Sequence, residues 1–227
     1  MTNQQRFNPL NDYLFYKIMG EEGDEVQLLG FINAALHRTG ENLFKSVEIL
    51  ENKTFTPEVI GDKTSILDVR AVLQDNTRAN IEVQLRNHQN MDKRSLFYWS
   101  REYVKGIKAG HDYHKLPNVI AINIVNYDFP AVGEVHTCFH LREDLNKNFI
   151  LTEALEIHYL NMVQYRKQWK GKLDDPLSRW LAWFDMGNEK ELAEEAVKMD
   201  AAIQAANERM VYVTGDKEAI RHEKRPR

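Results

Sequence analysis

Hydrophobic positions alternate along residues 65–86 in a way that predicts two β-strands joined by a tight turn. One phase of the first run holds Leu67, Val69, Ala71 and Leu73, and one phase of the second run holds Ile81, Val83 and Leu85. Because side chains alternate between the faces of a strand, each strand has one apolar and one mixed face. The link at residues 74–76 contains Asp75 and Asn76, which tolerate left-handed backbone angles. We therefore predict a hairpin with a three-residue loop.

The mixed face of this hairpin carries two acidic residues, Asp68 and Glu82, with Gln84 beside them. The three-residue loop predicts that Asp68 lies opposite Glu82, and a one-residue slip would turn both carboxylates toward the core. Two carboxylates at short range repel each other unless a cation compensates, and Mg²⁺ is commonly held by one or two carboxylates together with water and phosphate oxygens. The alternative is a solvent-exposed face neutralised by Arg70 and Arg86, and the spacing alone favours that alternative.

The rest of the chain predicts an α/β protein. We expect helices over residues 9–20, 24–37, 92–109, 177–186 and 189–210. Strands are expected over residues 47–50, 134–141 and 155–160, and the nearly continuous apolar run 119–125 predicts a central strand covered on both faces. The expected apolar stripe of the second helix consists of Val26, Leu29, Ile32 and Leu36. A mixed sheet with helices on both sides, an α/β/α arrangement, accounts for this order.

The helix predicted over residues 92–109 has a one-sided basic stripe. The stripe comprises Arg94, Tyr98, Arg101, Lys105 and Lys108, and the opposite side carries Leu96, Trp99, Tyr103 and Ile107. A basic stripe with an aromatic residue suits a phosphate backbone, through charge pairing and counterion release. A solvated helix face is the alternative, and the two interpretations carry equal weight.

Composition narrows the choice of function. The 227 residues are 43% hydrophobic and 28% charged, as in a globular protein that buries a full core. A net charge of −4 excludes a generally basic surface, so any nucleic-acid binding requires a local patch.

The single cysteine, Cys138, excludes an intramolecular disulfide and a cysteine-based zinc site. Without a signal peptide or an apolar run of membrane-spanning length, we expect a cytoplasmic protein. His111 and His114 beside Asp112 are a less favoured metal site.

Asp68, a short hairpin and then Glu82-Val83-Gln84 resemble the D…(D/E)-x-K core of the PD-(D/E)XK nuclease superfamily, with Gln84 in the lysine position. The surrounding segments are more specific than the motif. They are residues 11–20, 65–71, 80–85, 94–103, 110–113 and 116–124. In that order they resemble the recombination-promoting nuclease family, also described as transposases of the PD-(D/E)XK type, over residues 8 to 210.

This resemblance implies a restriction-endonuclease-like α/β/α core and hydrolysis of DNA phosphodiester bonds to leave a 5′-phosphate. Asp68 and Glu82, with the carbonyl of Val83, are then expected to bind Mg²⁺ or Mn²⁺, and Gln84 completes the catalytic set. A glutamine can hydrogen-bond a water molecule but carries no charge, unlike the usual lysine.

The residues expected to contact DNA lie on the helix after the hairpin, which packs beside it in related nuclease cores. They are Arg94, Tyr98, Arg101 and Lys105. Asp12 and Lys17 resemble the acidic and basic members of the family's opening motif and are accessory candidates. For Asp12 a helix cap is the equally weighted alternative.

We expect a nuclease-like core over residues 1–170 and a helical C-terminal extension over residues 171–227. The rival interpretation is a catalytically inactive nuclease fold that binds DNA or protein, favoured by the acidic balance and the missing lysine. Nothing in the residues separates DNA from RNA as substrate. A homodimer is a further expectation, because many related nucleases cut duplexes as dimers.

Overall fold

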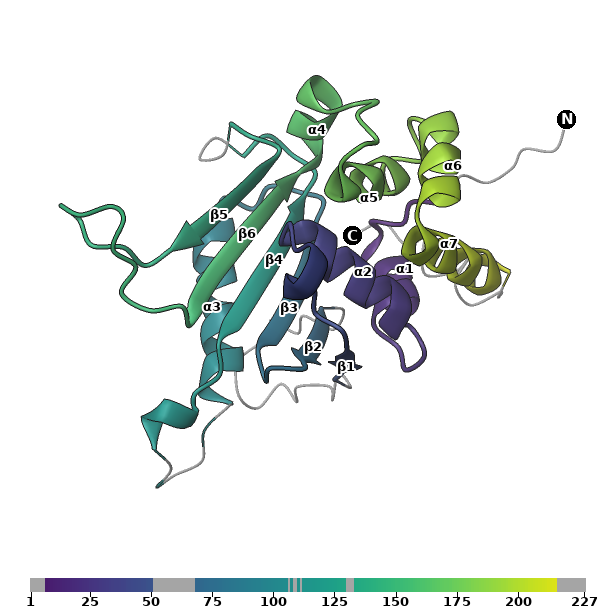
Figure 1. Ribbon diagram of the computed structural model, residues 1–227. Helices are drawn as coiled ribbons and strands as arrows, with labels where there is room; N and C mark the ends of the chain where they lie inside the picture. The colour runs from purple at the N-terminus through teal and green to yellow at the C-terminus, as the bar shows by residue number, and fades with distance from the viewer. Residues whose placement is uncertain are drawn as a thin grey trace, which may run out of the picture.

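A computed structural model of the chain describes residues 7–50, 68–105, 107, 110, 112–129 and 133–215. In these ranges six strands form one mixed sheet in the order β1-β2-β3-β4-β6-β5 (Figure 1). The strands are β1 Val47–Ile49, β2 Val69–Leu73, β3 Arg78–Gln84, β4 Val119–Val125, β5 His136–His140 and β6 Leu155–Asn161. The three central strands β3, β4 and β6 are parallel, and the outer strands pair antiparallel. The expected mixed sheet is confirmed, and β4 is buried along its whole length.

Helices cover both faces of this sheet (Figure 1). The helices are α1 Asp12–Met19, α2 Glu25–Ala35, α3 Met91–Val104, α4 Met162–Gln168, α5 Pro176–Phe184, α6 Lys190–Met199 and α7 Ala201–Thr214, with 3₁₀ turns at Gly40–Asn42 and Tyr113–Lys115. One face packs against α3 through a small cluster that includes Met91, Ala121 and Ile157. The other packs against α1, α2, α5 and α7 through the main hydrophobic core. The architecture is the α/β fold of restriction-endonuclease-like proteins.

The hairpin β2–β3 follows the expected turn chemistry. Asn76 has a φ of 67°, and its amide donates to the Leu73 carbonyl at 2.9 Å. The next pair closes the loop, because the Leu73 amide donates to the Thr77 carbonyl at 2.8 Å. The turn therefore comprises residues 74–76.

The N-terminal helices begin and end close to the expected positions. Asn11 caps α1 by accepting from two backbone amides, and Gly20 ends the helix. The expected apolar stripe of α2 is confirmed at Ile32, which is buried, and at Leu29 and Leu36, which pack against the core. It is wrong at Val26, which is 61% exposed, while Leu28 and Phe31 are buried in addition. The reason is tertiary: Phe31 packs edge-on against Trp180 and Phe184 of α5, which sets the rotation of α2.

The C-terminal helices share the main core with the N-terminal helices. Trp180, Trp183 and Phe184 are among the largest fully buried or nearly fully buried side chains and pack within the same cluster as α1 and α2. The single helix expected over residues 189–210 is wrong. Asp200 has an extended backbone (φ −140°, ψ 117°) and caps a second helix, α7. No helix in the described ranges is long and apolar enough to cross a bilayer.

Candidate active site

The acid pair, which we define as Asp68 and Glu82, lies at the end of the hairpin. Val69 pairs with Ile81, so the next step of the same register places Asp68 opposite Glu82, as the loop length predicted. Asp68 is 8% exposed and Glu82 only 2%. The solvent-exposed acidic face considered from spacing alone is therefore wrong, and two carboxyl groups are buried side by side.

The electrostatic setting of Glu82 is unfavourable to its charge. The pKa of Glu82 is raised to about 8, mainly by burial and next by the negative charge of Asp68, while the Arg94 guanidinium opposes both effects. Asp12 at the start of α1 also raises this pKa, which places a third carboxylate near the pair. Among the described residues none donates a hydrogen bond to Glu82 Oε2, a buried atom. A buried carboxylate oxygen without a donor, beside a second carboxyl group, fits a bound cation.

Helix α3 lies over the acid pair. Arg94 Nε donates to Glu82 Oε1, and the Arg94 guanidinium stands 5.0 Å from the centre of the Tyr98 ring. Tyr98 is only 8% exposed, whereas Leu96 on the opposite side is 50% exposed. The side of α3 that carries Arg94 and Tyr98 thus faces the sheet, as the resemblance implied. The helix ends at Val104, earlier than predicted, and Lys108 lies outside the described residues.

A basic group occupies the neighbouring part of the same sheet face. Glu102 of α3 accepts from Arg70 Nε at 2.7 Å and from its second nitrogen at 3.0 Å. Lys105 Nζ donates to Glu102 Oε1 at 2.8 Å, and Arg78 lies 3.6 Å from Oε2. Three cations around one carboxylate leave a net positive charge beside the acid pair. Lys105 therefore points toward this group, while Arg101 stacks near Phe97 and Tyr98.

The structure adds a polar row across the sheet that the sequence prediction missed. Asn123 of β4 pairs with Glu82 on one side and Tyr159 on the other. Ser95 of α3 joins them, with its Oγ 3.1 Å from Asn123 Oδ1 and 2.9 Å from the Tyr159 hydroxyl. An asparagine in the middle of an apolar strand was the available signal, since buried polar groups need partners. Tyr127 lies close to Glu82 as well. Burial is the main cause that raises the pKa of Tyr127 to about 12, and the charges of Tyr159 and Glu82 contribute to the rise.

Comparison with known protein families shows which family this chain belongs to. The model of the PD-(D/E)XK nuclease family transposases matches residues 9–226. The chain belongs to this family. No curated protein and no solved structure matches it significantly. PD-(D/E)XK nucleases typically use divalent metal ions, which agrees with the open oxygen on Glu82.

Gln84 stands where the resemblance expects the third residue of the PD-(D/E)XK motif. Its Nε2 donates to the Arg86 carbonyl at 3.0 Å, so the amide is engaged with the chain's own backbone. Val83, between the two polar residues, is half-buried and its side chain packs against the main core on the opposite face. The strand thus presents Glu82 and Gln84 to one side.

The other candidate residues named from the sequence are Asp12, Lys17 and two histidines, His111 and His114. Asp12 is the first residue of α1, and the cap is Asn11, so the alternative in which Asp12 caps the helix is wrong. Lys17 forms an ion pair with Glu21 near the end of α1. His114 lies exposed in the 3₁₀ turn, and His111 is outside the described residues. Among the described residues the cluster with metal-ligand geometry is a different one, Cys138, His140 and Glu156.

Proposed function

We propose that this PD-(D/E)XK family transposase is a metal-dependent endonuclease that hydrolyses phosphodiester bonds of DNA. The observation that carries the proposal is the acid pair, two buried carboxyl groups in register with a free oxygen on Glu82. Such a pair is costly to a protein without a cation, because desolvation and mutual repulsion both oppose ionisation. Family membership supports a nuclease or transposition role.

In the proposed mechanism Asp68 and Glu82 hold Mg²⁺ or Mn²⁺, with the Val83 carbonyl as an additional ligand. A cation held by these residues would polarise the scissile phosphate and lower the pKa of a water molecule bound to it. Arg94 balances the charge of Glu82 and keeps that carboxylate oriented. Gln84 positions a water by hydrogen bonding once its amide leaves the Arg86 carbonyl, and it adds no charge. Asp12 is an accessory acidic residue at the edge of the site, and Lys17 is an accessory cationic residue farther along α1.

DNA is the proposed partner, and the cytoplasm the proposed location. The side of α3 with Arg94, Tyr98, Arg101 and Lys105 lies beside the acid pair and the Arg70 group, which gives a local positive region in a chain of net charge −4. Local charge of this kind suits a phosphate backbone. We further propose that a homodimer cuts duplex DNA.

The deciding experiment is cleavage of supercoiled plasmid with Mg²⁺, with Mn²⁺ and with EDTA. Asp68→Ala or Glu82→Ala is expected to reduce the cleavage rate by more than roughly 100-fold. Loss of a residue that only hydrogen-bonds to a metal ligand costs up to about that much, and these two residues are proposed as ligands themselves. The matched control is Glu48→Ala, an exposed carboxylate on β1 of the same sheet, which is expected to cleave at the wild-type rate. Undiminished cleavage by both acid-pair variants would exclude this site.

A nuclease fold that only binds DNA or protein is the second candidate. One observation favours it: the amide of Gln84 is bonded to the Arg86 carbonyl, and the lysine of the motif is missing. Calorimetric titration with Mg²⁺ separates the two. Binding that is lost in Glu82→Ala supports the nuclease, while an absence of binding together with an absence of cleavage supports the binding module.

A further inference from the structure

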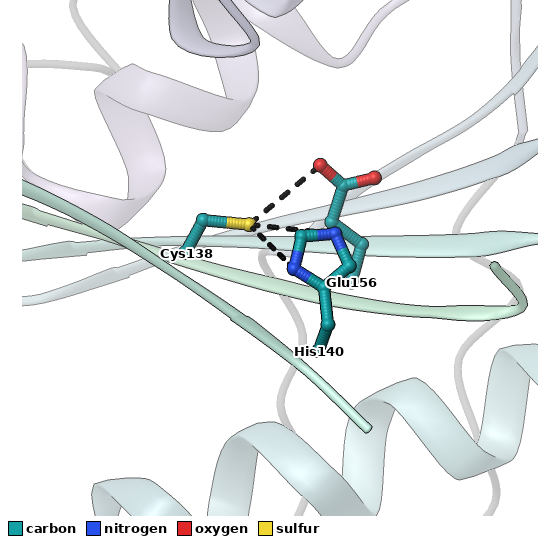
Figure 2. A group of neighbouring side chains, drawn as sticks. All are labelled: Cys138, His140 and Glu156. Atoms are coloured by element: carbon teal, nitrogen blue, oxygen red, sulfur yellow. Dashed lines mark hydrogen bonds between the residues drawn. The ribbon is translucent and has the colours of Figure 1, made fainter. Parts of the chain in front are cut away.

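A second cluster of metal-ligating side chains lies at the opposite edge of the sheet from β1, on strands β5 and β6. Cys138 pairs with His158 and His140 pairs with Glu156 in the antiparallel register, so all four side chains share one face. Figure 2 shows Cys138, His140 and Glu156 converging from the two strands. Because Tyr159 shares the face of Asn123 and Glu82, His158 and its neighbours lie on the other face. The cluster is therefore separate from the acid pair.

The distances within this cluster match those of a tetrahedral metal centre. Cys138 Sγ lies 3.6 Å from His140 Nδ1, 3.7 Å from Glu156 Oε1 and 3.6 Å from His158 Nε2. With ordinary Zn–S, Zn–N and Zn–O bond lengths, tetrahedral ligands lie about 3.3–3.7 Å from one another. His158 Nε2 and Glu156 Oε1 are closer, at 2.8 Å, and need to separate by a fraction of an ångström. The ligand atoms of Cys138, His140 and Glu156 all lie within 4.8 Å of one another, and His158 adjoins this group through Cys138 and Glu156.

The buried member of the cluster, His158, is oriented by a row of further side chains. It is 3% exposed, and its Nδ1 lies 2.8 Å from His136 Nε2. His136 Nδ1 in turn lies 2.9 Å from His37 Nε2, and His37 Nδ1 lies 3.7 Å from Asp175. If Nδ1 carries the proton in His158 and His136, each of these two imidazoles donates to the next one, and His158 Nε2 is left with its lone pair toward the cluster. His37 Nδ1 lies within ion-pair distance of Asp175 and makes no hydrogen bond to it. Metal-binding histidines are commonly oriented in this way by an outer hydrogen bond.

We propose that Cys138, His140, Glu156 and His158 form a structural site for a thiophilic divalent cation, with Zn²⁺ as the expected ion. This proposal revises the expectation that a single cysteine excludes a cysteine-based zinc site, because two histidines and a carboxylate supply the other ligands. One thiolate, two imidazoles and one carboxylate are the donor types that zinc takes, whereas the all-oxygen acid pair suits Mg²⁺. Four protein ligands leave no open position, which points to a structural and not a catalytic centre. The site joins the edge strand β5 to β6, and an edge strand gains most from such a link. This proposal is independent of the nuclease activity.

Cobalt titration of the full-length, tag-free protein is the direct test, because Cys138 is the only cysteine of the chain. After removal of metal by chelator, one equivalent of Co²⁺ is expected to give the thiolate-to-cobalt charge-transfer band and the strong visible bands of tetrahedral coordination. Zn²⁺ is expected to displace it. Cys138→Ser removes the charge-transfer band, and the exposed position of Cys138 makes this variant compatible with folding.

Three further variants locate the site. Glu156→Gln is expected to weaken Co²⁺ binding strongly, and His136→Ala to weaken it about 10–100-fold while keeping the thiolate band, as loss of an outer partner does. Asp68→Ala is expected to leave the spectrum unchanged, since the acid pair lies on the other face. His114→Ala, which replaces an exposed histidine, is the matched control. Absence of a thiolate-to-cobalt band in the wild type, or binding unaffected by Glu156→Gln, would overturn the proposal.

Discussion

At the scale of single residues, Glu82 stands out because its surroundings oppose its charge. It is 2% exposed, faces Asp68 and has one carboxylate oxygen without a donor among the described residues. Residues held in such settings commonly trade stability for function. Without metal, the protein should therefore be less stable at alkaline pH than a variant in which residue 82 carries no charge.

Glu82→Gln is expected to reveal this cost in thermal unfolding with EDTA. The folded-state pKa of Glu82 is about 8, above its ordinary value of 4.5, so between these values the unfolded chain releases a proton that the folded chain retains. Wild-type stability therefore falls as pH rises through this window, and the variant lacks that contribution. As the pH rises through this window, we expect the melting temperature of the variant to exceed that of the wild type by several degrees more. This follows from a change of about 2–4 °C in melting temperature for each kcal/mol of stability.

The same measurement with Mg²⁺ tests the site directly. Adding the cation should raise the melting temperature of the wild type, because a ligand that binds only the folded state stabilises it. Glu82→Gln should respond weakly. Parallel pH profiles for the two proteins without metal would show that Glu82 is not the strained group.

At the scale of elements, α3 is attached to the sheet by polar contacts. Its buried residues are Met91, Ser95, Tyr98 and Glu102, and Leu96 points outward. The sheet face below carries Arg70, Asn80 and Asn123, which need hydrogen-bonding partners once they are buried. The rotation of α3 is set by satisfying these groups, even at the cost of exposing a leucine.

Glu102→Ala should therefore loosen α3. Arg70 and Glu102 have side chains only 12% and 4% exposed, and removal of one member of a buried pair costs about 3–5 kcal/mol because the other is left uncompensated. Urea unfolding measures the loss. The double variant Arg70→Leu, Glu102→Leu is expected to recover much of it. Glu191→Ala, which removes an exposed carboxylate of α6, is the control. If Glu102→Ala and Glu191→Ala lower the free energy of unfolding equally, Glu102 does not stabilise the protein through a buried ion pair.

At the scale of the whole molecule, the two ends of the chain build one core. Helix α2 and helix α7 approach so closely at Gly30 that an added Cβ would lie 2.3 Å from the Ala202 Cβ. Trp180 of α5 fills the space next to them. We keep the division into a core of residues 1–170 and a helical extension of residues 171–227 as a proposal, with the extension packed into the core through α5 and α7.

Gly30→Ala tests this contact. The overlap with Ala202 is expected to cost about 1–3 kcal/mol, as overpacking does, against a gain in helix propensity of about 1 kcal/mol. Adding Ala202→Gly should restore the contact distance and most of the lost stability. If Gly30→Ala alone is stabilising in chemical unfolding, the close approach of α2 and α7 is wrong.

Local features of the sequence determined much of this protein. The turn residues Asp75 and Asn76 set the hairpin length, and that length brought Asp68 opposite Glu82 without knowledge of any distant contact. The apolar strand β4 was equally predictable, because strand burial shows in residues a few positions apart. The sequence left the cap of α1 open, and the structure places it at Asn11. Sequence resemblance then supplied the family.

Only the tertiary structure decided which elements meet. Arg94 and Glu82 are 12 positions apart, and Cys138 and Glu156 are 18 apart, so no local period relates them. The face that α3 buries and the alignment of β5 with β6 follow from long-range packing, which balances burial against hydrogen bonding over the whole sheet. For this reason the acid pair was predictable from a hairpin, whereas the cysteine–histidine cluster appeared only once two strands were placed side by side.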